Sequence, residues 1–190
     1  EKMSKSKRNV VDPDAIIERF GADTARWFML SDTPPERDIE WTEAGAEGAW
    51  RFTQRIWRLV NDAAAHAGGS DAAASLELRR AAHKALTAVT EDLEALRFNR
   101  AIARIYELAN ALGQAMGKAE AASLREAAEF LVLMSAPMMP HLAEECWQAL
   151  GHTQAVVDTP WPKADPALVA DDTVTIAVQV NGKRRDEVTV

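Results

Sequence analysis

The chain has 190 residues, of which 47% are hydrophobic and 27% charged, and its formal net charge is −7. These values are typical of a globular protein and allow one full domain with its own core and part of another. An acidic chain is not attracted to nucleic acid as a whole, so such binding must come from local basic patches. No apolar run reaches the roughly 18 residues of a membrane span. With no signal peptide either, we expect no membrane contact and a cytoplasmic location.

The cysteine and histidine content argues against disulfides and metals. The single cysteine, Cys146, excludes an internal disulfide, and four scattered histidines supply no metal-ligand spacing. Cys146 follows Leu142 and Ala143 at helical spacing, which predicts a packed thiol rather than a nucleophile. We therefore expect no metal site in these residues.

The first elements are a loop and two short helices. Residues 1–11 have no helical period and predict a loop. Asp12 followed by Pro13 predicts a helix start, and Gly21 is placed to end that helix. Asp23 can cap a second short helix.

Longer amphipathic segments follow, joined by short polar links. Their expected N-terminal caps are Thr42, Ser75, Asn99 and Ser123, the last within a capping box that ends at Glu126. The expected helices, including a last one after two prolines, cover about residues 43–67, 75–96, 99–112, 123–134 and 141–150. This pattern predicts a mainly α protein, an antiparallel helix bundle.

The composition changes after the bundle. Residues 154–172 are rich in Pro, Asp and Ala and predict a linker, after which apolar residues alternate with a period of two. An Asn-Gly pair at 181–182 marks a β-hairpin. We favour a three-residue loop over a two-residue one, because it sets Ile176 opposite Val188 on one face.

The hairpin is not expected to be complete by itself. A two-stranded hairpin is not independently stable in water, and nothing in the sequence packs its apolar face. We therefore expect residues 173–190 to begin a truncated C-terminal domain, and the chain to be a fragment cut at both ends.

The run Lys2-Met3-Ser4-Lys5-Ser6 is the motif best suited to chemistry. It offers two ammonium groups, two hydroxyls and free backbone N–H groups on one loop, which suits the negative charge that develops at transferring phosphates. A mobile loop also lets a nucleotide enter before the cations close over it. The alternative is a solvated Lys/Ser-rich tail, and the glycines of a Walker loop are missing.

This run is identified as the KMSKS signature of class I aminoacyl-tRNA synthetases. The following FGADTAR (residues 20–26) resembles the stretch after that loop in the leucine, isoleucine, valine and methionine enzymes. Within that group the chain most resembles the bacterial leucyl-tRNA synthetase family, through residues 38–60, 136–151 and 178–188.

The resemblance implies a reaction and a role for each residue of the signature. Leucine and ATP (with Mg²⁺) give leucyl-adenylate and pyrophosphate, and the leucyl group then passes to the terminal adenosine of tRNA(Leu). Lys5 is expected to contact ATP and steady the pyrophosphate as the catalytic residue, with Lys2 as a supporting cation. Met3 is expected to anchor the loop, and Ser4 and Ser6 to supply polar contacts. The family's His-x-Gly-His signature is absent from these residues, so we expect them to be inactive alone.

The resemblance also implies a bundle that docks tRNA. In this family it is called the anticodon-binding domain, and the C-terminal domain approaches the tRNA elbow. The candidate tRNA contacts are basic residues on one helix face and at the hairpin tip: Arg51, Arg55, Arg58, Lys183, Arg184 and Arg185. For the helix set we favour a solvated face with ion pairs to nearby Glu, and we expect Trp50 and Trp57 in the core. For the hairpin set, a charged edge that keeps the strand soluble is an equal alternative.

A further set of arginines and two other protein classes stay open. Arg97, Arg100 and Arg104 form a second, similarly ambiguous cationic set. The chain can also be part of a sibling synthetase for methionine, isoleucine or valine, or a helical RNA-binding or adaptor module without catalysis. The expected division is residues 1–41 (the end of a catalytic region), 42–153 (the bundle), 154–172 (the linker) and 173–190 (the truncated domain).

Overall fold

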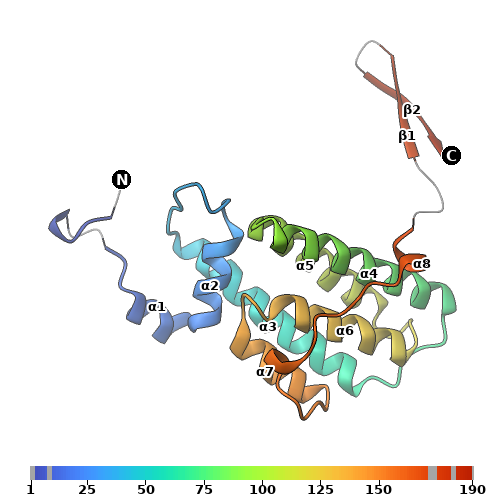
Figure 1. Cartoon of the computed structure of the whole chain (residues 1–190), viewed down its shortest axis with the longest axis horizontal. Helices are drawn as coiled ribbons and strands as arrows, with labels where there is room; N and C mark the ends of the chain where they lie inside the picture. Colours follow the sequence, from blue (N-terminus) through green and yellow to red (C-terminus); the bar gives the residue numbers. More distant parts are fainter. Residues whose placement is uncertain (1–2, 8–9, 171–174, 181–182, 190) are drawn as a thin grey trace.

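The protein is a helix bundle with short extensions at both ends. The computed structural model describes residues 3–7, 10–170, 175–180 and 183–189. In Figure 1 the first helix lies at one end of the molecule and the two strands rise from the other. The elements are η1 (Lys5–Lys7), α1 (Pro13–Phe20), α2 (Ala22–Ser31), α3 (Glu43–Ala65), α4 (Ala72–Glu94), α5 (Phe98–Ala115), α6 (Ala121–Ser135), α7 (Pro140–Ala149), η2 (Val156–Asp158), α8 (Pro166–Val169), β1 (Thr175–Val180) and β2 (Lys183–Thr189).

Two helix starts form as the sequence predicts. The Asp12 carboxylate accepts from the Asp14 N–H at 3.1 Å, with Pro13 at the first helical position of α1. The Thr42 hydroxyl accepts from the Gly45 N–H at 3.2 Å and caps α3. Both caps depend on neighbouring residues alone, which is why the sequence predicts them correctly.

The other four predicted caps are wrong. Gly21, Asp71, Arg97 and Glu120 occupy the N-cap positions of α2, α4, α5 and α6, so the residues predicted to cap lie inside these helices. Ser75 is instead buried, where its hydroxyl accepts from the Glu120 N–H at 2.9 Å and joins α4 to the start of α6. The Ser75 side chain thus bonds to a residue at the start of another helix, which a local pattern does not reveal.

The core lies among α2 to α7. α4 and α5 pack as an antiparallel pair with α6 against both, and α3 crosses beside α2, α6 and α7. Trp27 of α2 is fully buried, and its ring stacks on Phe52 of α3 at a centroid distance of 5.2 Å. Its indole N–H donates to the Tyr106 hydroxyl of α5 at 3.2 Å. This aromatic cluster fixes α2 on the bundle, because it buries the large Trp27 side chain and also gives the indole N–H a hydrogen-bond acceptor.

Residues 154–170, which we name the strap, pack against the bundle although the composition predicts a linker. The strap contains η2 and α8, and Val156 and Leu168 are each 7% exposed. Figure 1 follows it from α7 across the face of the bundle to the end from which β1 leaves. This part of the chain is therefore a docked segment rather than a free tether.

The two strands pair antiparallel with a register shift. Val180 pairs with Lys183, which differs from the predicted three-residue loop, and residues 181–182 themselves lie outside the described residues. The register then shifts by one residue, so that Ile176 lies opposite Val188. A bulge of this kind brings the apolar positions of two strands back to one face after an even loop.

Two further properties concern the described residues alone. Cys146 is buried, and burial raises the pKa of its thiol to about 12, with a smaller contribution from Glu145, so the packed thiol that the sequence predicts is confirmed. Within the described ranges, no helix is long and apolar enough to cross a membrane, and no group of three His, Cys, Asp or Glu is arranged to hold a metal ion.

Candidate functional site

The lysine- and serine-rich loop turns back on itself at residues 4–7. The Ser4 and Ser6 hydroxyl oxygens lie 2.8 Å apart, and the Ser4 hydroxyl accepts from the Lys7 N–H at 3.3 Å. Met3 is 44% exposed. Lys2 lies outside the described residues, and Lys5, the first residue of η1, is described in its backbone only. The sequence predicts a loop here, and the structure refines it to a loop with one 3₁₀ turn.

Helix α2 joins this loop region to the far side of the bundle. The Asp23 carboxylate accepts from the Leu142 N–H at 2.6 Å and lies 2.8 Å from Nδ1 of His141, so it caps α7 rather than its own helix. The Arg26 guanidinium donates to the carbonyls of Pro137 and Met138 at 3.0 and 3.1 Å. We name Asp23 and Arg26 the α2 joint. Sequence reasoning missed it, because nothing local links residues more than 100 positions apart.

The outward face of α3 carries aromatic rings beside cations. Trp50 is 43% exposed and Trp57 38% exposed, so the prediction that both lie in the core is wrong. Arg51 and Arg58 are exposed too and stand next to them in the sequence. Residues seven apart share a helix face, so the two rings form one stripe and the two cations form an adjacent one. We name these four residues the α3 face.

The arginines of α3 differ in how they are held. Arg55 reaches across to α5, where it donates to the Ala109 carbonyl at 3.3 Å. In the described part of the chain no carboxylate forms an ion pair with Arg51 or Arg58, so the pairing with Glu that we favoured is not formed. These two cations therefore keep their charge directed to solvent.

The second set of arginines is ion-paired. Arg97 and Arg100 lie 3.9 and 3.3 Å from a carboxylate oxygen of Asp92, and Arg104 lies 3.1 Å from one of Glu107. Asp92 itself is buried. A buried carboxylate needs such partners, so we assign Arg97 and Arg100 to the stability of the α4–α5 corner, whereas Arg104 forms an exposed pair within α5.

The basic residues near the hairpin tip occupy the start of β2. Lys183 pairs with Val180 and Arg184 with Gln179, while Arg185 stands at the register shift and has no partner position on β1. The structure describes these residues in their backbone only. The three basic residues are therefore the first three residues of β2, next to the turn.

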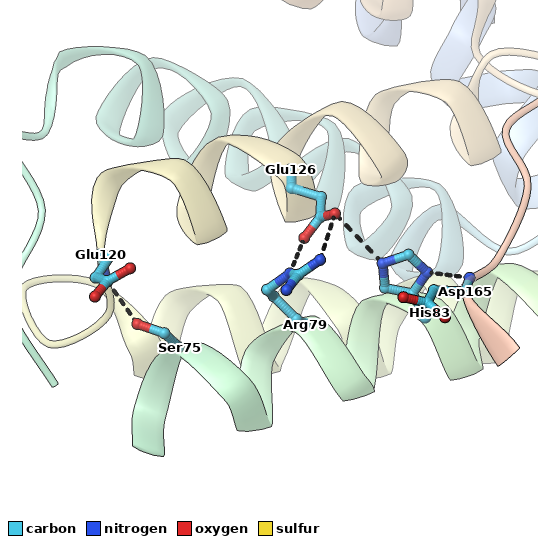
Figure 2. A network of polar contacts seen from close by, with 6 residues as sticks. All are labelled: Ser75, Arg79, His83, Glu120, Glu126 and Asp165. Carbon is cyan, nitrogen blue, oxygen red and sulfur yellow. Dashed lines mark hydrogen bonds and ion pairs between the residues drawn. The ribbon is translucent and has the colours of Figure 1, made fainter. Parts of the chain in front are cut away.

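A polar network links α4, α6 and the strap (Figure 2). Arg79 binds Glu126 through two hydrogen bonds of 2.6 and 3.3 Å. Nε2 of His83 lies 3.4 Å from Glu126, and Nδ1 of His83 accepts from the Asp165 N–H at 2.9 Å. Partial burial raises the pKa of Glu126, but Arg79 and His83 more than offset this and lower the pKa overall. The hydrogen bond to Glu126 raises the pKa of Arg79.

Family models match two parts of the chain. Residues 1–42 match the tRNA synthetases class I (I, L, M and V), and residues 76–190 match the anticodon-binding domain of tRNA ligase. The chain is 62% identical over 199 residues to the leucine–tRNA ligase of Parvibaculum lavamentivorans and 57% identical over 203 residues to that of Mesorhizobium japonicum. Each match covers all of this chain and 23% of the relative. The chain thus spans about a quarter of the length of these relatives.

Solved structures share the fold. The LeuRS–tRNA–LeuAMS ternary complex of Agrobacterium radiobacter K84 matches with a TM-score of 0.87 and 31% identity, over 100% of this chain and 26% of that one. The free methionyl-tRNA synthetase of Mycobacterium tuberculosis matches with a TM-score of 0.59 and 18% identity, over 84% of this chain and 42% of that one, which is a likeness of fold alone. The chain therefore belongs to the family of the anticodon-binding domain of tRNA ligase, its first 42 residues match the class I tRNA synthetases, and it is similar along its whole length to part of the leucine–tRNA ligases.

Proposed function

We propose that this chain is the ATP-loop and tRNA-docking part of an enzyme that attaches leucine to tRNA(Leu). The observation that carries the proposal is the KMSKS run at residues 2–6 within a chain that is 62% identical to a leucine–tRNA ligase. In the proposed reaction the leucine carboxylate attacks the α-phosphate of ATP, and pyrophosphate leaves. A hydroxyl of the terminal adenosine of tRNA then displaces AMP from the leucyl-adenylate.

The loop acts on the first of these steps. Lys5 closes on the phosphates as charge builds on the α-phosphate and the leaving pyrophosphate, and Lys2 supports it. Met3 anchors the loop, and Ser4 and Ser6 contribute polar contacts. The Ser4–Ser6 contact supports this assignment, because it gives the loop a defined turn before nucleotide arrives. Mg²⁺ is proposed to arrive with ATP, and no residue of this chain is assigned as its ligand.

The chain divides by role along its length. We assign residues 1–41 to the end of the catalytic region and residues 42–153 to the tRNA-docking bundle. Residues 154–172 connect the bundle to residues 173–190, which we assign to a C-terminal tRNA-binding region. The α2 joint supports this arrangement, since it ties the first of these parts to the second.

The α3 face and the start of β2 are the proposed tRNA contacts. Arg51 and Arg58 direct charge to solvent without an ion pair among the described residues, which suits phosphate binding. Trp50 and Trp57 supply exposed rings beside them, and stacking of a base or sugar on such a ring stabilises RNA binding by about 1–3 kcal/mol per base. Arg55 is occupied by the Ala109 carbonyl and contributes less. Lys183, Arg184 and Arg185 add charge at the strand.

We test the reaction with a polypeptide of the relatives' full length that carries these 190 residues, referred to below as the full-length enzyme. Leucine is expected to support ATP–pyrophosphate exchange at least tenfold faster than isoleucine, valine or methionine at equal concentration. The measurement is incorporation of labelled pyrophosphate into ATP with each amino acid in turn. Faster exchange with one of the other three would assign the chain to a sibling enzyme. No exchange with any of them would favour a non-catalytic RNA-binding module.

A second prediction tests the α3 face. Arg51→Ala combined with Arg58→Ala in the full-length enzyme should weaken tRNA(Leu) binding by about tenfold and make the slope of log K against log[salt] shallower by about 1.5, because two phosphate contacts are lost. The measurement is a binding titration at several salt concentrations. Arg104→Ala is the matched control, since it removes an arginine that already pairs with Glu107. An unchanged salt slope in the double variant would remove the α3 face from the RNA interface.

A further inference from the structure

The strap is held on the bundle by a series of polar anchors. At its start the Glu144 carboxylate of α7 accepts from the Val156 and Val157 N–H groups at 3.0 and 3.3 Å. Further along, the Trp161 indole N–H donates to the Thr90 hydroxyl of α4 at 2.9 Å. Two turns back along α4 lies the last anchor, where the Asp165 N–H donates to His83. The strap therefore runs antiparallel to α4, fixed at both ends and in the middle.

The last anchor depends on the chemistry of one buried imidazole. His83 is 4% exposed and packs edge-on against the Phe130 ring. Because Nδ1 accepts a hydrogen bond from a backbone N–H, that nitrogen carries no proton, and the ring proton belongs on Nε2, which faces Glu126 (Figure 2). Arg79 holds Glu126 in turn through two hydrogen bonds. The network thus orients the imidazole so that its acceptor nitrogen points at the strap.

Beyond this anchor the strap ends in one turn of helix. The Asp165 carboxylate caps α8 by accepting from the Ala167 N–H at 3.0 Å, and Leu168 is buried against the bundle. β1 begins at Thr175, six residues after the end of α8 at Val169. A chain spans at most about 3.6 Å per residue, so β1 must begin within roughly 22 Å of Val169. If the His83 anchor and α8 release, the last fixed point becomes Trp161, and the bound grows to roughly 50 Å.

We propose that His83 is a positioning residue, which clamps the strap to α4 and α6 and thereby limits where β1 and β2 can lie relative to the bundle. The inference rests on the proposed function in one respect only: β2 and the α3 face bind the same RNA molecule. Two contacts on one RNA reinforce each other through an effective concentration that falls as about the −3/2 power of the length joining them. Lengthening the connection from six residues to fourteen lowers the effective concentration by about fourfold.

The first experiment measures tRNA use by the full-length enzyme. His83→Leu removes the acceptor nitrogen at similar volume and should raise the KM for tRNA(Leu) by about fourfold, with kcat and ATP–pyrophosphate exchange unchanged. His83→Asn is the matched control, because its amide oxygen takes the place of Nδ1 as acceptor, and it should restore the KM to within twofold of the unaltered enzyme. A KM that is unchanged in His83→Leu, or raised equally by His83→Asn, would overturn the proposal.

A second variant separates the effect of the length between the strap and β1 from any effect on packing near His83. Eight Gly and Ser residues inserted after Ala170 lengthen the connection from six residues to fourteen and leave the network of Figure 2 untouched. This insertion should raise the KM for tRNA by the same factor. His83→Leu should then add only about twofold more, because the connection grows from fourteen residues to about twenty-two and the effective concentration falls less steeply. Full additivity of the two effects, or an insertion without effect, would contradict the proposal.

A third readout does not depend on activity. Spin labels placed by Asn110→Cys on α5 and Glu187→Cys on β2 report the distance between bundle and strands, while the buried native Cys146 stays unlabelled. In His83→Leu the distance distribution should extend to longer values, by up to the difference between the two bounds above, and in His83→Asn it should not. An identical distribution in both variants would refute the clamp. Loss of exchange and tRNA binding in the unaltered enzyme, with this contrast intact, would refute the proposed function alone.

Discussion

Lys5→Ala in the full-length enzyme is expected to slow leucine-dependent ATP–pyrophosphate exchange by about 100-fold or more. Removing one group that stabilises the charge developing in a transition state costs about 10²–10³ in rate, and Lys5 is proposed to be such a group once the loop has closed. The loss should fall on kcat, with the KM for ATP changing by less than about threefold, because the contact strengthens as the pyrophosphate leaves.

The comparison variant for Lys5→Ala is Lys118→Ala, which removes one exposed lysine from the turn between α5 and α6. It lowers the net charge by the same amount and should leave the exchange rate within twofold. The measurement is steady-state exchange at saturating leucine and varied ATP. If Lys5→Ala exchanged as fast as Lys118→Ala, the role assigned to the KMSKS loop would be lost.

Trp27→Ala should destabilise the chain by about 3–5 kcal/mol, the usual cost of removing a fully buried large aromatic side chain. The change empties the space between α2, α3 and α5 and leaves the Tyr106 hydroxyl without its indole donor. Since Trp27 anchors α2, the α2 joint should also loosen. The measurement is the denaturant midpoint and slope of this chain, followed by far-ultraviolet circular dichroism.

Trp57→Ala is the matched control, because it truncates the same residue type on the surface of α3. It should cost less than about 1 kcal/mol, in keeping with a side chain that is 38% exposed. The pair thus compares a tryptophan that builds the core with one assigned to RNA. Equal loss of stability in both variants would mean that the outward face of α3 is packed in the folded chain.

The sequence predicts the bundle well because helical periodicity reports which residues avoid water. Phe52, Ile56 and Val60 recur at helical spacing, and all three are buried. Periodicity fails at Trp50 and Trp57, because it places apolar residues on a face without saying whether anything covers that face. The exposed rings flank the buried stripe of α3, next to the buried Thr53, so angular position on the helix alone does not tell them from core residues.

The joints between distant segments were beyond sequence reasoning. Asp23 has the residue type and spacing of a local cap, but its carboxylate meets α7 instead of its own helix. The strap has the composition of a linker, yet Trp161 and Asp165 dock it through hydrogen bonds to α4. In each case the deciding partner lies more than 70 positions away, and only the fold brings the two together.

The way α1 and α2 are seated has a consequence for heat lability. α1 contains no buried residue, and the buried residues of α2, including Trp27 and Phe28, face the bundle, so this region has no interior of its own. The position of the proposed nucleotide loop therefore depends on how α2 packs against the bundle. Substitutions that make the proposed adenylate formation temperature-sensitive should therefore occur among the buried residues of α5 as well as near Lys2 and Lys5.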